Sequence, residues 1–181
     1  MKEIRVHGRG GQGGVTAAVI IGEASVTEGH YAQSYPAFGT ERRGAPVLAF
    51  CRISDTPIRS RAMVYSPDIV IVLDEGLLQL VDVSAGLKPG GTIIVNTAKS
   101  ADAFQFKNPG IVVTVDATSI SLNTLGRPIV NTTILGTLCG ATGVIQLDSL
   151  KAAVLSTFRG SLGTKNVAAM EESYRQYKRS A

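Results

Sequence analysis

Apolar residues follow two patterns along this chain: short continuous runs, and stripes at three- and four-residue spacing. Runs bounded by turn residues predict strands, whereas stripes predict amphipathic helices. The predicted strands cover residues 4–7, 30–35, 47–53, 58–64, 69–73, 92–96 and 110–115. Helices are predicted from the stripe Val15, Ala18, Val19, Gly22 and Val26, from Leu77, Leu78 and Val81, and over most of the chain after residue 115. In that last part, residues 131–133 are predicted to cap a helix in which Gly136 and Gly140, four residues apart, allow close approach to a neighbouring element.

Strands that alternate with helices indicate an α/β fold. The runs 69–73 and 92–96 contain few polar residues, which is typical of central parallel strands covered on both faces. Strands 47–53 and 58–64 are joined by the turn-rich stretch 54–57 and predict an antiparallel hairpin. We therefore predict a single three-layer α/β/α domain over residues 1–181, with a mixed, mainly parallel sheet that starts with a Rossmann-like glycine loop.

That loop lies between the first strand and the first helix. It consists of Gly8, Arg9, Gly10, Gly11, Gln12 and Gly13, with Gly14 following. Glycines allow positive φ and close backbone approach, and the N-terminus of a helix offers free N–H groups and partial positive charge to an anion. The loop is therefore a candidate anion site. The alternative is that the glycines only allow tight packing between strand and helix.

A dinucleotide site of the Rossmann type would also need an acidic residue at the end of the second strand, to bind the ribose. Strand 30–35 ends without one, and Glu28 precedes that strand. Asp74 and Glu75 instead follow strand 69–73, at the sheet edge where ligands bind in α/β folds. Their alternative role is to cap the helix that follows.

Charge is distributed unevenly along the chain. Its net charge is +4, and seven of the eleven arginines fall in the first third: Arg5, Arg9, Arg42, Arg43, Arg52, Arg59 and Arg61. This favours an anionic ligand or an acidic partner surface there. Basic residues do not form runs interleaved with aromatic residues, so we expect no nucleic acid as partner.

Two of these arginine pairs have alternative interpretations. Arg42 and Arg43 lie in a loop with two prolines and two glycines, which is either functional or a solvated surface loop. Arg59 and Arg61 are predicted on one face of strand 58–64, where they either bind an anion or keep an edge strand soluble.

Catalytic residues are scarce in the sequence. Of two histidines, His7 lies beside the glycine loop and either contacts an anion or cofactor or serves as a structural residue. Cys51 and Cys139 form no metal, iron–sulfur or disulfide motif and are predicted to be buried free thiols. We therefore predict no catalytic centre and no metal site, only a binding or assembly module. No apolar run approaches the length of a membrane span, and we expect a cytoplasmic protein.

Five separated motifs then agree in order with one family. The motifs are Gly8–Gly13, 38–46, Pro67-Asp68 before an apolar strand, Asp116-Ala117-Thr118, and Asn131-Thr132 with Leu135-Gly136. Over nearly its whole length the chain resembles the gamma subunit of 2-oxoacid:ferredoxin oxidoreductases. Its Glu-Arg-x-Gly-Ala-Pro motif is most similar to the pyruvate and branched-chain 2-oxoacid members.

The resemblance implies a subunit of a larger enzyme with alpha, beta and delta-type partners. Such an enzyme uses thiamine diphosphate to decarboxylate the 2-oxo acid, passes electrons through iron–sulfur clusters to ferredoxin, and transfers the acyl group to coenzyme A. The isolated chain is then expected to be inactive and to bind no cofactor firmly. The glycine loop with Arg9, and Arg42 or Arg43, would serve coenzyme A or a partner surface. The alternatives are an NAD(P)-binding Rossmann-type reductase and a purely structural scaffold.

Overall fold

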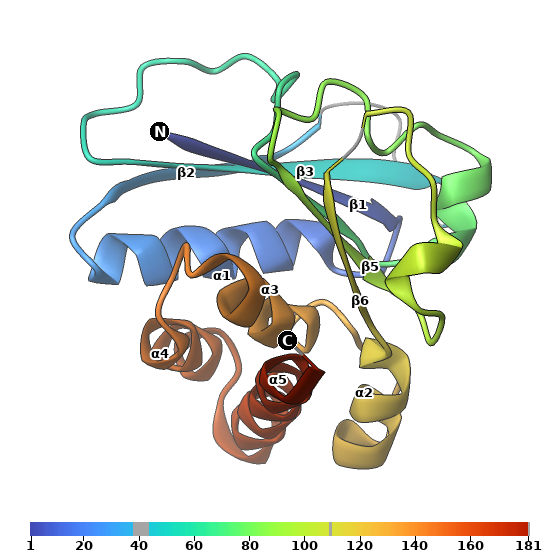
Figure 1. Cartoon of the computed structure of the whole chain (residues 1–181). Coiled ribbons are helices and arrows are strands. Elements are labelled where there is room, and N and C mark those ends of the chain that lie inside the picture. Colours follow the sequence, from blue (N-terminus) through green and yellow to red (C-terminus); the bar gives the residue numbers. More distant parts are fainter. Residues whose placement is uncertain (38–43, 109, 181) are drawn as a thin grey trace.

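The chain folds around one six-stranded sheet with helices packed mainly on one face (Figure 1). A computed structural model describes residues 1–37, 44–108 and 110–180. Its strands are β1 (Lys2–Arg9), β2 (Tyr31–Pro36), β3 (Pro46–Ser54), β4 (Ile69–Val72), β5 (Thr92–Asn96) and β6 (Ile111–Val115). Its α-helices are α1 (Gly14–Thr27), α2 (Ala117–Leu125), α3 (Ile134–Thr142), α4 (Leu147–Thr157) and α5 (Gly160–Ser180). Two short 3₁₀ helices are η1 (Glu75–Gln79) and η2 (Ala101–Ala103).

The sheet has the order β2-β3-β1-β4-β5-β6. Strands β1, β4, β5 and β6 run parallel, whereas β3 is antiparallel to both of its neighbours. The predicted mixed, mainly parallel sheet is therefore confirmed. The central strands β4 and β5 are fully buried, as their continuous apolar runs predicted.

The predicted strand 58–64, and with it the hairpin to strand 47–53, is wrong. Both edges of β3 are already occupied by β1 and β2, and residues 58–64 form no strand. Their carbonyl groups are bonded by side chains instead: Arg52 donates to Ala62 and Met63, and Arg5 donates to Val64. These guanidinium groups replace the ladder partner that a strand would require.

Helix α1 covers β1, β2 and β3, α3 contacts β5 and β6, and α4 and α5 form an outer layer on the same face (Figure 1). The other face carries a second apolar cluster, in which Val70, Val72, Ile93 and Val95 pack against Leu77 of η1. The α/β class is thus confirmed, and the layer on the second face consists of η1 and irregular segments. The helix predicted from Leu77, Leu78 and Val81 is only the short η1.

Glycines set how closely α3 and α5 pack. A Cβ atom at Gly136 would overlap the backbone carbonyl of Met170, and one at Gly140 would lie 2.7 Å from the ring of Tyr177. The close approach predicted from the four-residue spacing of these glycines is confirmed. The predicted cap at residues 131–133 is not made, because Thr133 forms no side-chain cap and Asn131 bonds elsewhere.

Candidate functional site at the glycine loop

The glycine loop connects β1 to α1 at the edge of the sheet where the parallel strands end. Gly13 has φ of 77° and is the N-cap residue of α1. It provides no side-chain cap, and the first turn of α1 contains no acidic residue. No side chain therefore caps the N–H groups at this helix end, as an anion site would require, and the anion site stays a prediction.

Arg9 of the loop is held in an ion pair. Its Nε donates to Oδ2 of Asp74 at 2.8 Å, and the Nε2 atom of Gln12 donates to the same oxygen at 3.1 Å. Gln12 also accepts from the backbone N–H of Arg9, and Nη1 of Arg9 donates to the carbonyl of Gly44. The Arg9 side chain keeps 29% of its surface exposed. It can therefore contact a ligand without leaving Asp74.

Asp74 takes the capping role that the sequence offered as an alternative, and it also pairs with Arg9. Burial alone would raise the pKa of its carboxyl, but hydrogen bonds from Arg9 and Gln12 outweigh burial and hold that pKa below its ordinary value. Its Oδ1 atom accepts from the N–H of Gly76 and so caps η1. Asp74 is therefore an ionised link between the glycine loop and η1.

Asn131 approaches the loop from the other side of the site. Its Nδ2 atom donates to the carbonyl of Gly13 at 3.3 Å, although 118 residues separate the two in sequence. The side chain is 4% exposed, and its Oδ1 is buried without a hydrogen-bond partner in the described structure. An unpartnered buried acceptor of this kind is unusual.

A cavity of about 510 Å³ opens beside the loop. It is lined by Gly11, Gln12, Asp74, Glu75, Asn96, Asp116, Thr118 and neighbouring residues, with no lysine or arginine among its described lining residues. All three carboxylates have partners: Asp74 binds Arg9, Glu75 binds Lys99, and Asp116 caps α2. Phosphate groups would therefore be favoured at the loop and Arg9, and disfavoured inside the cavity.

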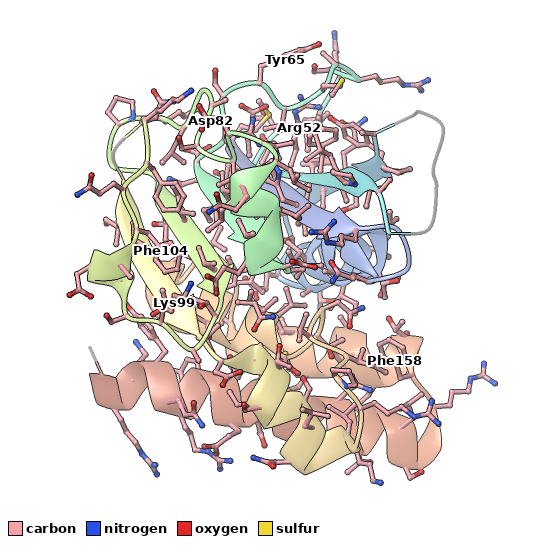
Figure 2. The ribbon with its side chains drawn as sticks, turned by 90° about the vertical axis from the view of Figure 1, so that its right-hand side faces the viewer. Arg52, Tyr65, Asp82, Lys99, Phe104 and Phe158 are labelled. Atoms are coloured by element: carbon pink, nitrogen blue, oxygen red, sulfur yellow. The ribbon has the colours of Figure 1, made fainter. Side chains whose placement is uncertain are left out.

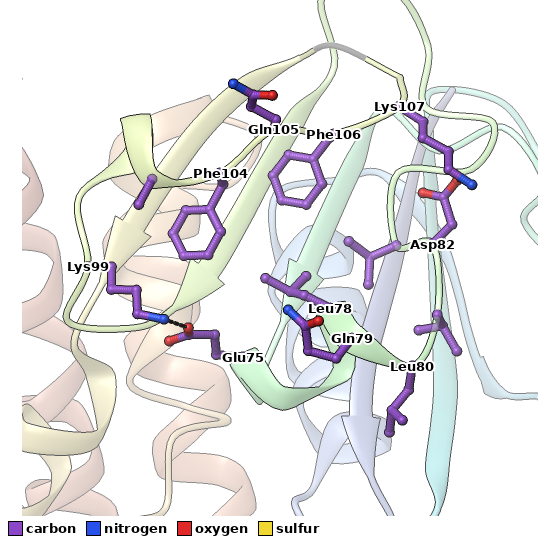
Figure 3. Close-up of a pocket in the computed structure, with 13 residues that line it drawn as sticks. Glu75, Leu78, Gln79, Leu80, Asp82, Lys99, Phe104, Gln105, Phe106 and Lys107 are labelled. Atoms are coloured by element: carbon purple, nitrogen blue, oxygen red, sulfur yellow. Dashed lines mark hydrogen bonds and ion pairs between the residues drawn. The ribbon is translucent and has the colours of Figure 1, made fainter.

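A second groove, of about 500 Å³, lies between η1 and the segment around η2 (Figure 3). The rings of Phe104 and Phe106 lie side by side along one wall. The two lysines that line the groove are both paired with acids, Lys99 with Glu75 and Lys107 with Asp82. This groove consequently offers an apolar wall but no unpaired cation for a phosphate.

His7 has a structural role. It is 5% exposed, and its Nε2 accepts from Nε of Arg5 at 3.1 Å. Burial, assisted by the nearby Arg5 charge, lowers the pKa of His7 to about 3 against a weaker opposing effect of Asp82. The ring is therefore neutral and lies away from the open end of α1.

Neither a metal nor an iron–sulfur cluster fits the described residues. Cys51 and Cys139 are free and buried, as predicted, and two cysteines cannot supply the four thiolates of a cluster. Within residues 1–37, 44–108 and 110–180, no three metal-binding side chains gather at one point. No helix in that part of the chain is long and apolar enough to cross a bilayer.

The strand order also bears on the dinucleotide alternative. In a Rossmann unit the second strand lies parallel and next to the first, so that its acidic end faces the glycine loop. Here β3 separates β2 from β1, and β2 runs antiparallel to β3. Glu28, the acidic residue that precedes β2, does not serve such a site, because its side chain accepts from the N–H of Gln146. A ribose site of that type is thus disfavoured.

The glycine pattern predicts the loop but not the distant residues that contact it. The structure joins Arg9 and Gln12 to Asp74, and Gly13 to Asn131, across 62 to 118 residues of sequence. The sequence predicts Asn131 as part of a helix cap, and no local pattern indicates its contact with Gly13. Arg42 and Arg43, the other predicted site residues, lie outside the described residues.

Comparisons with known proteins agree on one family. The model of the family "Pyruvate ferredoxin/flavodoxin oxidoreductase" matches residues 3–176. The pyruvate/ketoisovalerate oxidoreductases common subunit gamma of Thermococcus kodakarensis is 55% identical over 96% of each chain, and the pyruvate synthase subunit PorC of Methanothermobacter marburgensis is 52% identical over 99% of each.

Solved structures give the same result. The pyruvate oxidoreductase subunit PORC of Thermotoga maritima superimposes with a TM-score of 0.84 at 36% identity, over 96% of this chain and 95% of that one. A keto/oxoacid ferredoxin oxidoreductase gamma subunit from Geobacter sulfurreducens gives 0.80 at 27% identity over 99% of both chains. The resemblance found in the sequence is confirmed, and the chain belongs to the pyruvate ferredoxin/flavodoxin oxidoreductase family as a gamma-type subunit.

Proposed function

We propose that this chain is the gamma subunit of a thiamine-diphosphate-dependent pyruvate:ferredoxin oxidoreductase with alpha, beta and delta-type companion subunits. The complex would convert the 2-oxo acid to acyl-coenzyme A and pass electrons to ferredoxin. The observation that carries the proposal is similarity to gamma subunits over 96% of both chains. Residues 1–181 would act as one gamma-type domain, and the two free thiols are typical of the cytoplasm.

The chemistry of the reaction would take place on the companion subunits. Decarboxylation needs thiamine diphosphate and electron transfer needs iron–sulfur clusters, and the donor set described above fits neither a cluster nor a metal. The contribution of this chain is then to assemble the complex and to bind or orient a ligand at one of its surfaces.

At the glycine loop, we propose a role on the coenzyme A side of the reaction. The uncapped N-terminus of α1 and the partly exposed Arg9 favour a phosphate group. The binding residues would be Gly8, Arg9, Gly10, Gly11, Gln12 and Gly13, with Arg42 and Arg43 as further cations.

A purely structural role is the second candidate, and the Arg9–Asp74 ion pair favours it. The shortest side-chain hydrogen bond of Arg9 goes to Asp74, so its charge is already balanced within the chain. In that case the loop would fix the position of η1 relative to β1, and the glycines would serve packing alone.

Two substitutions in the assembled complex distinguish these roles. Arg9→Ala removes the cation, whereas Asp74→Asn keeps the cation and removes its internal partner. If Arg9 binds a phosphate, Arg9→Ala should raise the KM for coenzyme A about tenfold, while Asp74→Asn leaves it unchanged or lower. Steady-state kinetics with varied coenzyme A, and separately varied pyruvate, measure this.

Arg159→Ala, at the exposed junction of α4 and α5, is the matched control for loss of an arginine. Subunit content by native mass spectrometry separates an assembly defect from a binding defect. An unchanged KM for coenzyme A in an intact Arg9→Ala complex would remove the coenzyme A role and leave the structural one.

A further inference from the structure

We propose that residues 58–65 and the apolar cavity beside them form a docking surface for a companion subunit. The occupant would be an acidic segment of that subunit that also carries a large apolar side chain. This inference rests on the proposed function, because it requires a multisubunit complex. It assigns to one surface the arginines of the first third of the chain that the glycine loop does not use.

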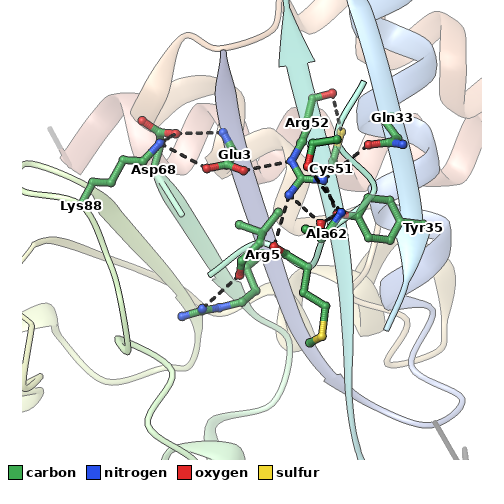
Figure 4. A network of polar contacts seen from close by, with 12 residues as sticks. Glu3, Arg5, Gln33, Tyr35, Cys51, Arg52, Ala62, Asp68 and Lys88 are labelled. Atoms are coloured by element: carbon green, nitrogen blue, oxygen red, sulfur yellow. Dashed lines mark hydrogen bonds and ion pairs between the residues drawn. The ribbon is translucent and has the colours of Figure 1, made fainter. Parts of the chain in front are cut away.

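Two buried arginines hold the segment in place. Arg52 is 2% exposed; its Nη2 donates to the carbonyls of Ala62 at 2.7 Å and Met63 at 3.3 Å, and its Nε donates to Glu3 (Figure 4). The hydroxyl of Tyr35 also donates to the carbonyl of Ala62, at 2.6 Å. The segment is therefore irregular in backbone yet fixed in position.

Arg5 supports the same segment from the other side. It is 7% exposed, and its guanidinium donates to the carbonyls of Val64, Val83 and Ala85. No carboxylate forms an ion pair with Arg5 in the described part of the chain. Burying the charge of Arg5 without such an ion pair is costly. Together with Arg52, whose charge is paired with Glu3, Arg5 fixes a largely exposed segment.

The exposed side of this segment is positively charged. Arg59 and Arg61 are both exposed, and neither has a partner among the described residues. The nearest acids in sequence and in the cavity are engaged elsewhere: Asp55 with His30, and Asp82 with Ser84 and Lys107. Unpaired cations at the rim of an interface attract and orient an acidic partner.

An apolar cavity of about 430 Å³ is lined in part by Met63, Val64 and Tyr65 of the same segment. Its apolar lining includes Val47, Leu48, Phe50, Met63, Tyr65 and Leu77. The rim is unusually exposed: Met63 shows 41% of its surface, Tyr65 69% and Val81 37%. Tyr65 lies at the outer edge of the molecule (Figure 2). An apolar pocket with exposed apolar edges, lined by a segment that also carries two exposed arginines, is the arrangement in which an interface anchor residue binds.

Charge reversal tests the surface in the reconstituted complex. The double variant Arg59→Glu/Arg61→Glu should weaken assembly with the companion subunits at least tenfold, and Tyr65→Ser should do the same through loss of the apolar rim. The control Arg159→Glu/Lys165→Glu makes the same charge change on exposed residues of the helical face and should assemble like the unaltered chain. Native mass spectrometry in a titration of companion subunits gives these affinities.

Hydrogen exchange provides a second readout that does not depend on variants. Residues 60–65 should gain protection when the complex assembles. Equal assembly of the double variant and the control, or absence of protection in an intact complex, would overturn the docking surface while leaving the proposed function standing. Protection of the same residues in the chain alone would identify a second copy as the occupant and would also overturn it. Failure of the unaltered chain to join the complex would overturn the proposed function itself.

Discussion

At the scale of single residues, the site is built from side chains that each satisfy a distant group. Gly13 lies against Asn131 and Arg9 lies against Asp74. Neither of these contacts follows from local periodicity, because the partners come together only when the sheet forms. The glycine spacing nevertheless predicted the loop, since positive φ and close approach are requirements that a single residue type meets.

Gly13 should tolerate alanine less well than Gly11 does. Both have positive φ, 77° and 95°, so alanine is strained at either position. A Cβ at Gly13 would also overlap Nδ2 of Asn131, whereas one at Gly11 meets no atom within 4 Å. We expect Gly11→Ala to lower the free energy of unfolding by about 1 kcal/mol and Gly13→Ala by about 3 kcal/mol. Urea unfolding of the two variants measures this, and equal losses would contradict the tight contact.

His7 should make stability depend on pH. The unfolded chain takes up a proton at the ordinary histidine pKa of 6.5, but the folded chain does so only near pH 3, because burial lowers the pKa of His7 to about 3. Between these values the unfolded state binds more protons, so the free energy of unfolding falls as the pH falls, by at most about 1.4 kcal/mol per pH unit.

Urea unfolding at pH 6.5 and pH 4.5 measures this contribution. The unaltered chain should lose about 2 kcal/mol more than His7→Gln over this interval, because contributions of other groups cancel in the comparison. The matched control is His30→Gln, whose ring is partly exposed beside Asp55. The same loss in His7→Gln and in the unaltered chain would show that His7 is not buried as a neutral ring.

At the scale of elements, the strands that are covered on both faces could be predicted and the segment held by side chains could not. Strands β4 and β5 are continuous apolar runs, so their burial is visible in sequence. Residues 58–64 also look like a strand, but the structure bonds their carbonyls to guanidinium groups. The alternating positions of Arg59 and Arg61 therefore do not reflect a strand, because the segment that carries them is irregular.

Loss of Arg52 should loosen this segment. Arg52→Met leaves Glu3 without its buried partner and frees the carbonyls of Ala62 and Met63. We expect the free energy of unfolding to fall by about 3 kcal/mol and trypsin to cleave sooner after Arg59 and Arg61. Timed proteolysis followed by mass spectrometry measures the cleavage.

The control for this experiment is Arg175→Met, which removes an exposed arginine paired with Glu172 on α5. This variant should be cleaved at Arg59 and Arg61 at the original rate, because exposed ion pairs contribute little. Cleavage of Arg52→Met at that same rate would show that Arg52 does not fix the segment.

At the scale of the whole molecule, the helices cover one face of the sheet and leave the two regions proposed as functional on the rest of the surface. One is the glycine loop at the end of the parallel strands, and the other is the surface of residues 58–65. The family could be identified from the sequence because its motifs are separated but ordered. The second region could not, because it depends on cavity shape and on which arginines are buried.

Reconstitution of the complex with and without this chain tests the central claim most directly. Companion subunits loaded with their cofactors are assayed for ferredoxin reduction that depends on both pyruvate and coenzyme A. The account predicts that this activity appears only when the chain is added and that the chain alone reduces no ferredoxin. Full activity of the companion subunits without the chain, or pyruvate oxidation by the chain alone, would contradict it.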